Sequence, residues 1–366
     1  MKRIYTLIAL VLVLVLLGAK ARAADPVDPV TPGDPVASAW QALPDATSLL
    51  VQRGGKTLIE WYAHGADAST LHDTRSATKS VTALVVAAAV QDGLLRWDSP
   101  VFDAFAAEQP LQHDGPPKRA ITVEDLLTMS SALDCNDWED ASPGNEENMY
   151  PQREWLRWTL DLPTRTPYTR DATGRGPFAY CTAGVFLLGQ LLERRVPGGL
   201  DAYQQQRLFA PLGILEWQWK RSDSGELLTG GGLRLRTRDL GKLALLLQQQ
   251  GVWLGRVLLK PELLARVLSV HRNTPMGLGY GQLFWQRAFK TRCGAQQGWM
   301  MSGNGGNIVA VFADSGLSIV LTRAHYNQRG MHEQSWAFIE QLLDRQLCPG
   351  VPSSSQRLIA LTPSLR

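Results

Sequence analysis

The 366-residue chain has only four cysteines, Cys135, Cys181, Cys293 and Cys348, and no two of them stand in CxxC spacing. Its six histidines include no HExxH sequence, so the usual zinc-ligand patterns are missing. A GxSxG elbow is also missing, which disfavours an α/β-hydrolase. The glycine-rich GNGGN stretch lacks both the GxGxxG and the GK[ST] pattern of nucleotide loops. The sequence therefore implies neither a metal nor a cofactor.

Long hydrophobic runs are missing beyond the first residues. Lys2 and Arg3 precede an apolar run over residues 4–18, and Ala21-Arg22-Ala23 forms a small-x-small cleavage pattern. The run is shorter than the roughly 20 residues that a membrane span needs. We therefore expect residues 1–23 to be a signal peptide and the protein to be periplasmic or secreted, with an uncleaved N-terminal membrane anchor as the alternative.

The chain also lacks an excess of positive charge outside the expected signal peptide. Its formal net charge is +3, and cleavage after Ala23 would remove four cations and leave −1 (3 minus 4). No nucleic-acid partner is therefore expected. The Pro-rich residues 24–44 are expected to form an extended linker, residues 45–348 a catalytic domain and residues 349–366 a C-terminal tail.

The four cysteines suit disulfides in an oxidising compartment. Four cysteines allow three pairings. We prefer Cys135–Cys181 with Cys293–Cys348, and the other two pairings remain open.

Hydrophobic patterning places strands at both ends of the chain and helices in the middle. A Gly-Gly turn at 54–55 predicts a hairpin over 48–64, and Thr122 with Asp125 resembles a capping box. These features predict an α+β fold, an antiparallel sheet from both chain ends flanked by helices, with a central mostly helical lobe at about 111–235. We expect helices near 76–91, 121–130, 182–195, 237–250 and 332–347, strands near 280–285, 299–302, 308–312 and 317–322, and long ordered loops over 134–173.

One motif suggests chemistry. Ser76 opens an apolar helix, and Lys79 stands three residues later on the same helix face. A serine hydroxyl needs a base, and a lysine is a base only when it is neutral, which burial favours. The helix N-terminus would add unpaired N–H groups beside an acyl oxyanion. The alternative without chemistry is that Ser76 only starts the helix and Lys79 is solvated. However, Lys79 is the only one of the nine lysines that follows a serine by three residues.

Several stretches resemble the serine beta-lactamase and penicillin-binding-protein superfamily, in particular its class C-like branch, which includes esterases and 6-aminohexanoate-dimer hydrolase. They occur in the family's order over about residues 45–345. They are RSATKS, ITVEDLLTMSSALD, FAYCTAGVFLLGQLLER, the glycine-led TGGGLRLRTRDLGKLALLLQQQ and MSGNGGNIVAVFADSGLSIVLTR.

The resemblance implies roles for individual residues. Ser76 would be the acylated nucleophile, Lys79 its proton acceptor and Tyr180 a proton relay or base. Thr182 stands where the family usually has asparagine, which leaves substrate orientation to a shorter side chain. Asn304 stands where the family has lysine or histidine, which removes an attraction for an anionic substrate group.

The glycines that follow Asn304 have an implied use as well. Gly305 and Gly306 would let a strand edge approach the substrate closely. The N–H of Asn307, with that of Ser76, would form the oxyanion hole. Arg323 or His325 would restore a positive charge nearby unless they are surface residues at a strand end. The acidic run over 138–150 is expected to be a loop at the pocket rim rather than a metal site.

These observations lead to one functional expectation and two alternatives. We expect an exported serine hydrolase that cleaves a small ester, amide or peptide-like substrate through an acyl-enzyme on Ser76. The first alternative is a beta-lactamase or D,D-peptidase that acts on cell-wall substrates. The second is a non-catalytic cell-wall or ligand-binding protein of the same fold, which Thr182 and Asn304 would favour.

Overall fold

The core of the molecule is an eight-stranded antiparallel sheet with strand order β2-β1-β13-β12-β11-β10-β9-β8. The computed structural model describes residues 34–349. The N-terminal hairpin joins the C-terminal strands because β1 pairs with β13, with Leu49 opposite Leu321. The strands of this sheet are β1 (Ala46–Arg53), β2 (Lys56–Tyr62), β8 (Arg272–Asn273), β9 (Gly279–Tyr280), β10 (Trp285–Phe289), β11 (Gln296–Gly303), β12 (Asn307–Phe312) and β13 (Leu317–Arg323).

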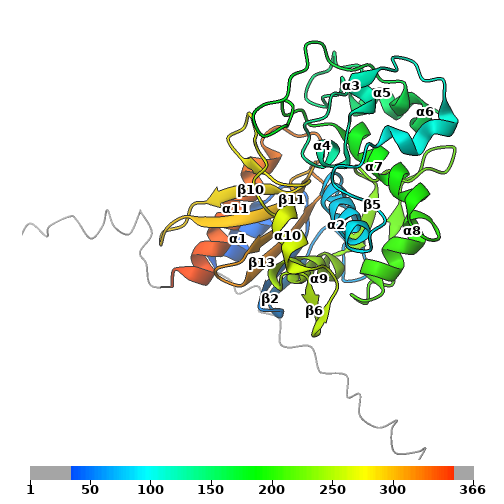
Figure 1. Ribbon diagram of the computed structural model, residues 1–366. Coiled ribbons are helices and arrows are strands. Elements are labelled where there is room, and N and C mark those ends of the chain that lie inside the picture. Colours follow the sequence, from blue (N-terminus) through cyan, green and yellow to red (C-terminus); the bar gives the residue numbers. More distant parts are fainter. Residues whose placement is uncertain (1–33, 350–366) are drawn as a thin grey trace, which may run out of the picture.

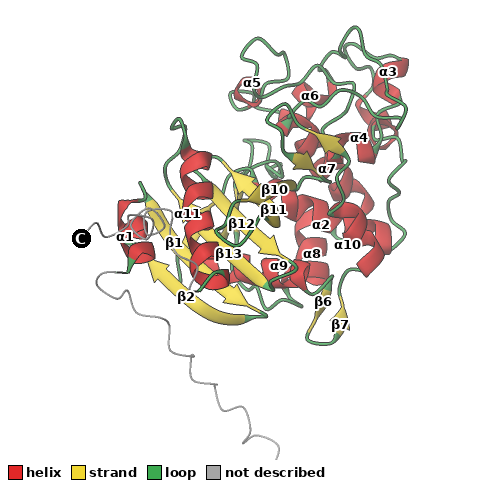
Figure 2. Cartoon of the chain, turned by 90° about the vertical axis from the view of Figure 1, so that its left-hand side faces the viewer, coloured by secondary structure: helices red, strands yellow, loops and turns green. Residues whose placement is uncertain are grey.

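Helices cover both faces of this sheet (Figures 1 and 2). α1 (Pro35–Ala42) and α11 (Met331–Leu347) pack together on one face, and α2 (Ala77–Gln91) and α9 (Thr237–Gln248) pack on the other. Every residue of β12 and β13 is buried, so their near-continuous apolar sequences NIVAVF and LSIVLTR follow from burial on two sides.

The middle of the chain forms a lobe of helices and loops beside the sheet (Figure 1). α7 (Thr182–Arg195) and, to a smaller extent, η2 (Gln205–Phe209) pack against α2 and join the lobe to the core. The remaining helices are η1 (Phe102–Glu108), α3 (Pro116–Arg119), α4 (Val123–Leu127), α5 (Glu146–Met149), α6 (Trp155–Leu160), α7 (Thr182–Arg195), α8 (Gly199–Gln204), η2 (Gln205–Phe209) and α10 (Pro261–Val267). The small sheets are β3 (Leu71–Asp73) with β5 (Leu233–Arg236) and β4 (Gln218–Trp219), and β6 (Val252–Trp253) with β7 (Arg256–Val257).

The predicted fold class is confirmed by this architecture. Thr122 and Asp125 form the predicted capping box at the start of α4. The preferred disulfides, Cys135–Cys181 and Cys293–Cys348, are both present, which is consistent with an oxidising compartment.

Three local predictions are wrong. Part of the expected linker over 24–44 is the helix α1, because Asp34 caps it, Pro35 takes its first position, and Trp40 is buried against α11; residues 24–33 lie outside the described residues. The expected strand over 280–285 is interrupted after Tyr280, where the chain turns back. The expected loops over 134–173 contain the short helices α5 and α6.

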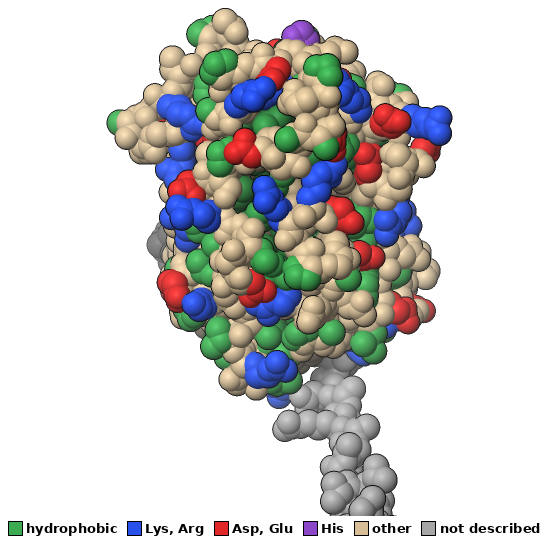
Figure 3. Space-filling model, turned by 45° about the vertical axis from the view of Figure 1, so that its right-hand side comes forward, with side chains coloured by type: hydrophobic (Ala, Val, Ile, Leu, Met, Phe, Trp, Pro, Cys, Tyr) green, Lys and Arg blue, Asp and Glu red, His purple; other side chains and the backbone are tan. Residues whose placement is uncertain are grey.

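Two further features concern membrane spans and surface charge. Within residues 34–349, no helix combines the length and the apolar character that a membrane span requires. The expected signal peptide and most of the C-terminal tail lie outside the described residues. On the face drawn in Figure 3, basic and acidic side chains of the described chain are interspersed.

Candidate active site

Ser76 precedes the most deeply buried helix of the molecule. Thirteen of the fifteen residues of α2 are buried, as expected of a helix that is apolar on all sides. The residue before Ser76, Arg75, has a positive φ of 51°, an uncommon conformation for a side chain of this size. Among the described residues, the Ser76 side chain makes no capping bond to the helix. Its hydroxyl instead accepts a hydrogen bond from Lys79.

Lys79 lies inside the protein and is only 1% exposed. Its Nζ donates to Ser76 Oγ at 2.9 Å and to the carbonyl of Gly230 at 2.6 Å. Neighbouring hydroxyls of α2 fix the segment that carries this carbonyl: Thr82 Oγ1 donates to the carbonyl of Thr229, and Thr78 Oγ1 accepts from Leu233 N. The polar side chains of this apolar helix therefore hold the acceptor that orients Lys79.

Tyr180 completes a cluster of three side chains. The Lys79 Nζ is 4.9 Å from the centre of the Tyr180 ring, and the Ser76 side chain is near enough to the Tyr180 hydroxyl to act on its pKa. Burial raises the pKa of Tyr180 above the ordinary tyrosine value, while the charge of Lys79 and the nearby Ser76 side chain oppose this shift. The phenol therefore stays protonated near neutral pH, ready to donate or pass on a proton.

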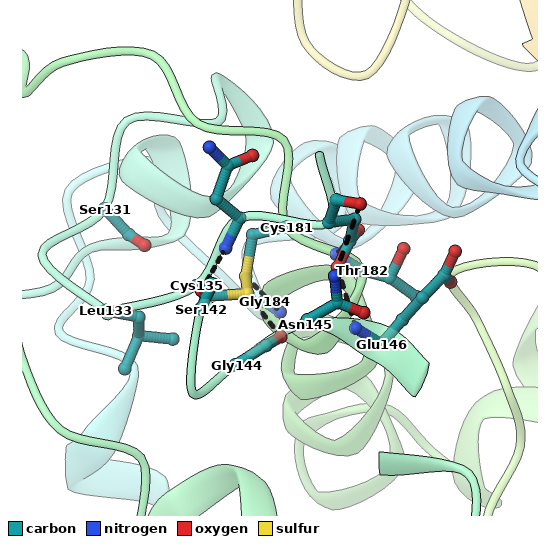
Figure 4. Close-up of a disulfide and its surroundings, with 12 residues drawn as sticks. Ser131, Leu133, Cys135, Ser142, Gly144, Asn145, Glu146, Cys181, Thr182 and Gly184 are labelled. Carbon is teal, nitrogen blue, oxygen red and sulfur yellow. Dashed lines mark hydrogen bonds between the residues drawn. A yellow bond between two sulfur atoms is a disulfide. The ribbon is translucent and has the colours of Figure 1, made fainter. Parts of the chain in front are cut away.

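Asp137 lies beside this cluster, although no sequence motif marks it. Its backbone N–H donates to the carbonyl of Tyr180 at 2.7 Å, and its Oδ2 accepts from the N–H of Thr182 at 2.7 Å. Its Oδ1 accepts from the N–H of Glu146 at 3.0 Å. The Cys135–Cys181 disulfide ties the same two segments together (Figure 4). Because Cys135 is two residues from Asp137 and Cys181 is next to Tyr180, the predicted disulfide was the sequence signal that could have placed Asp137 near Tyr180.

An aromatic cluster shields Tyr180 on its other side. The Trp138 ring stacks on the Tyr180 ring, with centres 5.6 Å apart and planes 6° apart. Trp285 of β10 contacts both rings. The acidic loop is therefore not merely solvated, because its first residue forms part of the packing around Tyr180.

Ser76 opens into a cavity of about 350 Å³. The acidic loop forms part of its rim as predicted, through Glu146, Glu147 and Tyr150, and the segment from β4 to β5 forms another part. Three cations that the sequence analysis missed also line it. These are Arg75 and Arg234, which both contact Asp73, and Lys220, whose Nζ lies 4.3 Å from the centre of the Tyr150 ring.

The remaining candidate residues lie at different distances from this cavity. Asn304 lines it, and its side chain donates to Asn327. Thr182 is completely buried, and within the described chain its hydroxyl has no hydrogen-bond partner. Its methyl group packs on Gly230, where an added Cβ would lie 2.6 Å away.

Residues 304–306 form the tight turn between β11 and β12, and the three residues after Asn304 lie outside the lining of this cavity. Gly305 and Gly306 have positive φ values of 90° and 80°. Asn307 is buried, and its side-chain amide donates to the carbonyls of Asn304 and Arg323. Gly303, the last residue of β11, lies against the turn before α2, where an added Cβ would lie 1.9 Å from the Thr74 carbonyl and 3.0 Å from Ala77 N.

Neither expected source of extra charge reaches the cavity within the described residues. Arg323 is 1% exposed, and its guanidinium donates to neutral acceptors that include the Met331 carbonyl and Ser335 Oγ. Its alternative interpretation as a surface residue is therefore wrong. His325 contacts Asp45 at 2.8 Å.

The fold and this cluster define a class of protein. A buried lysine that contacts a serine at the start of a core helix, between an antiparallel sheet and a helical lobe, is the arrangement of a serine hydrolase related to the penicillin-binding proteins. The chain belongs to the beta-lactamase family, whose family model matches residues 39–336.

Individual relatives agree with this assignment. The chain is 26% identical to 6-aminohexanoate-dimer hydrolase of Paenarthrobacter ureafaciens over 246 residues, which cover 62% of this chain and 60% of that protein. It is 33% identical to lovastatin esterase of Penicillium rubens over 161 residues, which cover 39% of this chain and 38% of that protein. These matches thus span less than two thirds of either relative.

A solved structure supports the fold. A protein of Bacillus anthracis that is provisionally described as a 6-aminohexanoate-dimer hydrolase superposes with a TM-score of 0.70 at 13% identity. The superposition covers 89% of this chain and 87% of that one. At this identity the likeness shows a common fold.

Proposed function

We propose that this protein is an exported serine hydrolase that cleaves a small ester or amide through an acyl-enzyme on Ser76, with Lys79 and Tyr180 moving the proton. The observation that carries the proposal is the hydrogen bond from buried Lys79 to Ser76 at the edge of a cavity. A serine whose hydroxyl already contacts a buried amine is arranged to lose its proton.

The proposed reaction has two stages. Ser76 Oγ attacks the substrate carbonyl, and its proton passes to the Lys79–Tyr180 unit, which shares it. The carbonyl–leaving group bond then breaks, and the leaving group takes that proton through the Tyr180 hydroxyl. Water attacks the acyl-serine in the second stage, which releases the acid and restores Ser76.

The oxyanion of each stage needs two N–H donors. The N–H of Ser76 at the start of α2 is one proposed donor. The sequence pattern suggested Asn307 as the other, but Gly303 is the backbone that lies against the turn before α2. We therefore propose the N–H of Gly303 as the second donor, in place of Asn307.

Replacing Gly303 with alanine tests this assignment. The new methyl group would collide with the Thr74 carbonyl and push the strand end away from Ser76. We expect kcat/KM for p-nitrophenyl esters to fall by about 10²–10³-fold, the usual cost of losing one oxyanion donor. Gly115→Ala is the matched control, since its backbone is extended and an added Cβ meets only Pro117 at 3.8 Å. Equal activity of the two variants would contradict the assignment.

The charge of the substrate distinguishes the proposed ester or amide hydrolase from the alternative, a beta-lactamase or D,D-peptidase. Neutral Asn304 favours a neutral ester or amide, whereas Arg75, Lys220 and Arg234 would suit a substrate that bears a carboxylate, as beta-lactams do. We expect the purified protein to hydrolyse short p-nitrophenyl esters and to leave nitrocefin nearly unchanged. Efficient nitrocefin turnover would favour the beta-lactamase alternative, and inactivity on both, with no covalent labelling of Ser76, would favour the binding-protein alternative.

A further inference from the structure

We propose that Asp137 is a positioning residue of the Ser76 site: it holds the segment of Tyr180 in place and supplies an anion that faces Lys79 and Tyr180. The inference rests on the proposed function of that site. Asp137 itself makes no contact with Ser76 among the described interactions, so its effect would pass through the Lys79–Tyr180 unit.

Asp137 connects the segment of Tyr180 to two helices of the lobe. Asp137 makes three backbone contacts, one before α7 through Tyr180, one at the first residue of α7 through Thr182, and one at the first residue of α5 through Glu146. The disulfide from Cys135 to Cys181 fixes the same junction two residues earlier. The hydrogen bonds of Asp137 and the disulfide together fix the backbone at Tyr180 and at the two residues that follow it.

Asp137 also lies within electrostatic range of several titratable groups. The groups that face Asp137 are Lys79 from α2, Tyr180 before α7, Glu146 from α5 and Tyr150 after it. Burial, and after it the charge of Glu146, raise the pKa of the Asp137 carboxyl to about 6, although Lys79 and the hydrogen bond from Thr182 act to lower it. Asp137 is therefore ionised at neutral pH, and it raises the pKa of Tyr180. An anion in this place favours the protonated form of the Tyr180 phenol.

Asp137→Asn tests the proposal through a pH profile. The rate of Ser76 phosphonylation by a fluorophosphonate probe is measured between about pH 5 and 9, because this reaction needs no knowledge of the substrate. The Ser76 Oγ–phosphorus bond forms, the phosphorus–fluorine bond breaks, and the serine proton passes to the Lys79–Tyr180 unit. Above about pH 6, where Asp137 of the wild type is ionised, we expect the acid limb of the rate profile to lie about one unit lower in pH in the variant, since the anion is gone.

Asp140→Asn is the matched control, because it removes the same charge from an exposed position on the same loop. We expect its profile to overlay that of the wild type. Asp137→Ser is a second uncharged variant in case the Asp137→Asn protein does not fold, and Asp137→Glu, which keeps the charge, should keep the limb near its wild-type position.

The outcomes separate the two proposals. A shifted limb in the uncharged variants supports the role of Asp137. A variant profile that is lower at every pH but unshifted would reduce Asp137 to a structural cap and overturn the inference alone. A wild type that the probe does not label at any pH would overturn the proposed function itself.

Discussion

Ser76→Ala is expected to lower kcat/KM for p-nitrophenyl acetate by at least about four orders of magnitude. The hydroxyl is the only atom of that residue that can form the acyl-enzyme, and loss of a nucleophile removes most of the catalysis that its partners provide. The fold should be retained, because among the described residues the Ser76 side chain does not cap α2. Steady-state kinetics with a thermal unfolding curve would measure both effects.

Ser80 offers a matched control one turn further along the same helix. Unlike Ser76 it is buried, and its hydroxyl donates to the carbonyl of Leu283 at 2.6 Å. Ser80→Ala should lower stability by about 1 kcal/mol through the lost hydrogen bond and leave kcat/KM within a few-fold of the wild type. Comparable loss of activity in both variants would point to damage of α2 rather than to loss of a nucleophile.

Lys79→Met is expected to lower kcat/KM by about a thousandfold. Methionine has a similar length but accepts no proton, and removal of a general base costs about 10²–10⁴-fold. The variant leaves the Gly230 carbonyl without its donor, so a stability loss of about 1–3 kcal/mol is expected as well. Kinetics and denaturant unfolding separate the two effects.

Lys118 provides the control for burial of a lysine. It is also 1% exposed, and its Nζ donates to the carbonyls of Gln112 and Leu160. Burial lowers the pKa of Lys118 to about 8, yet no serine hydroxyl is among its partners within the described chain. Lys118→Met should therefore lose stability but keep its activity. If it lost as much activity as Lys79→Met, the assignment of Lys79 as a base would fail.

The sequence predicted those parts of the fold that depend on local patterns. The Gly-Gly hairpin, the capping box of Thr122 and Asp125, and the helix after Ser76 each follow from spacing along the chain. The break after Tyr280 does not, because it depends on distant contacts: Leu283 N donates to the carbonyl of Leu127, and the Leu283 carbonyl accepts from Ser80. An apolar run alone cannot distinguish this turn from a strand.

The site shows the same division. The proximity of Ser76 and Lys79 follows from three-residue spacing on a helix. Tyr180 was predicted to join them only because the sequence resembles a known family. Asp137 and Gly303 reach the site only through tertiary structure, one through a disulfide-linked loop and the other through the end of β11. Neither residue type carries a signal by itself, since aspartate and glycine are both common in loops.

The most direct test of the account is peptide mass spectrometry of the folded protein after reaction with a fluorophosphonate. We predict one adduct, on the tryptic peptide that begins with Ser76 after cleavage at Arg75, and no adduct in Ser76→Ala. An adduct on a different serine, or a folded wild type that stays unmodified at every pH tested, would contradict the claim that Lys79 makes this hydroxyl a nucleophile.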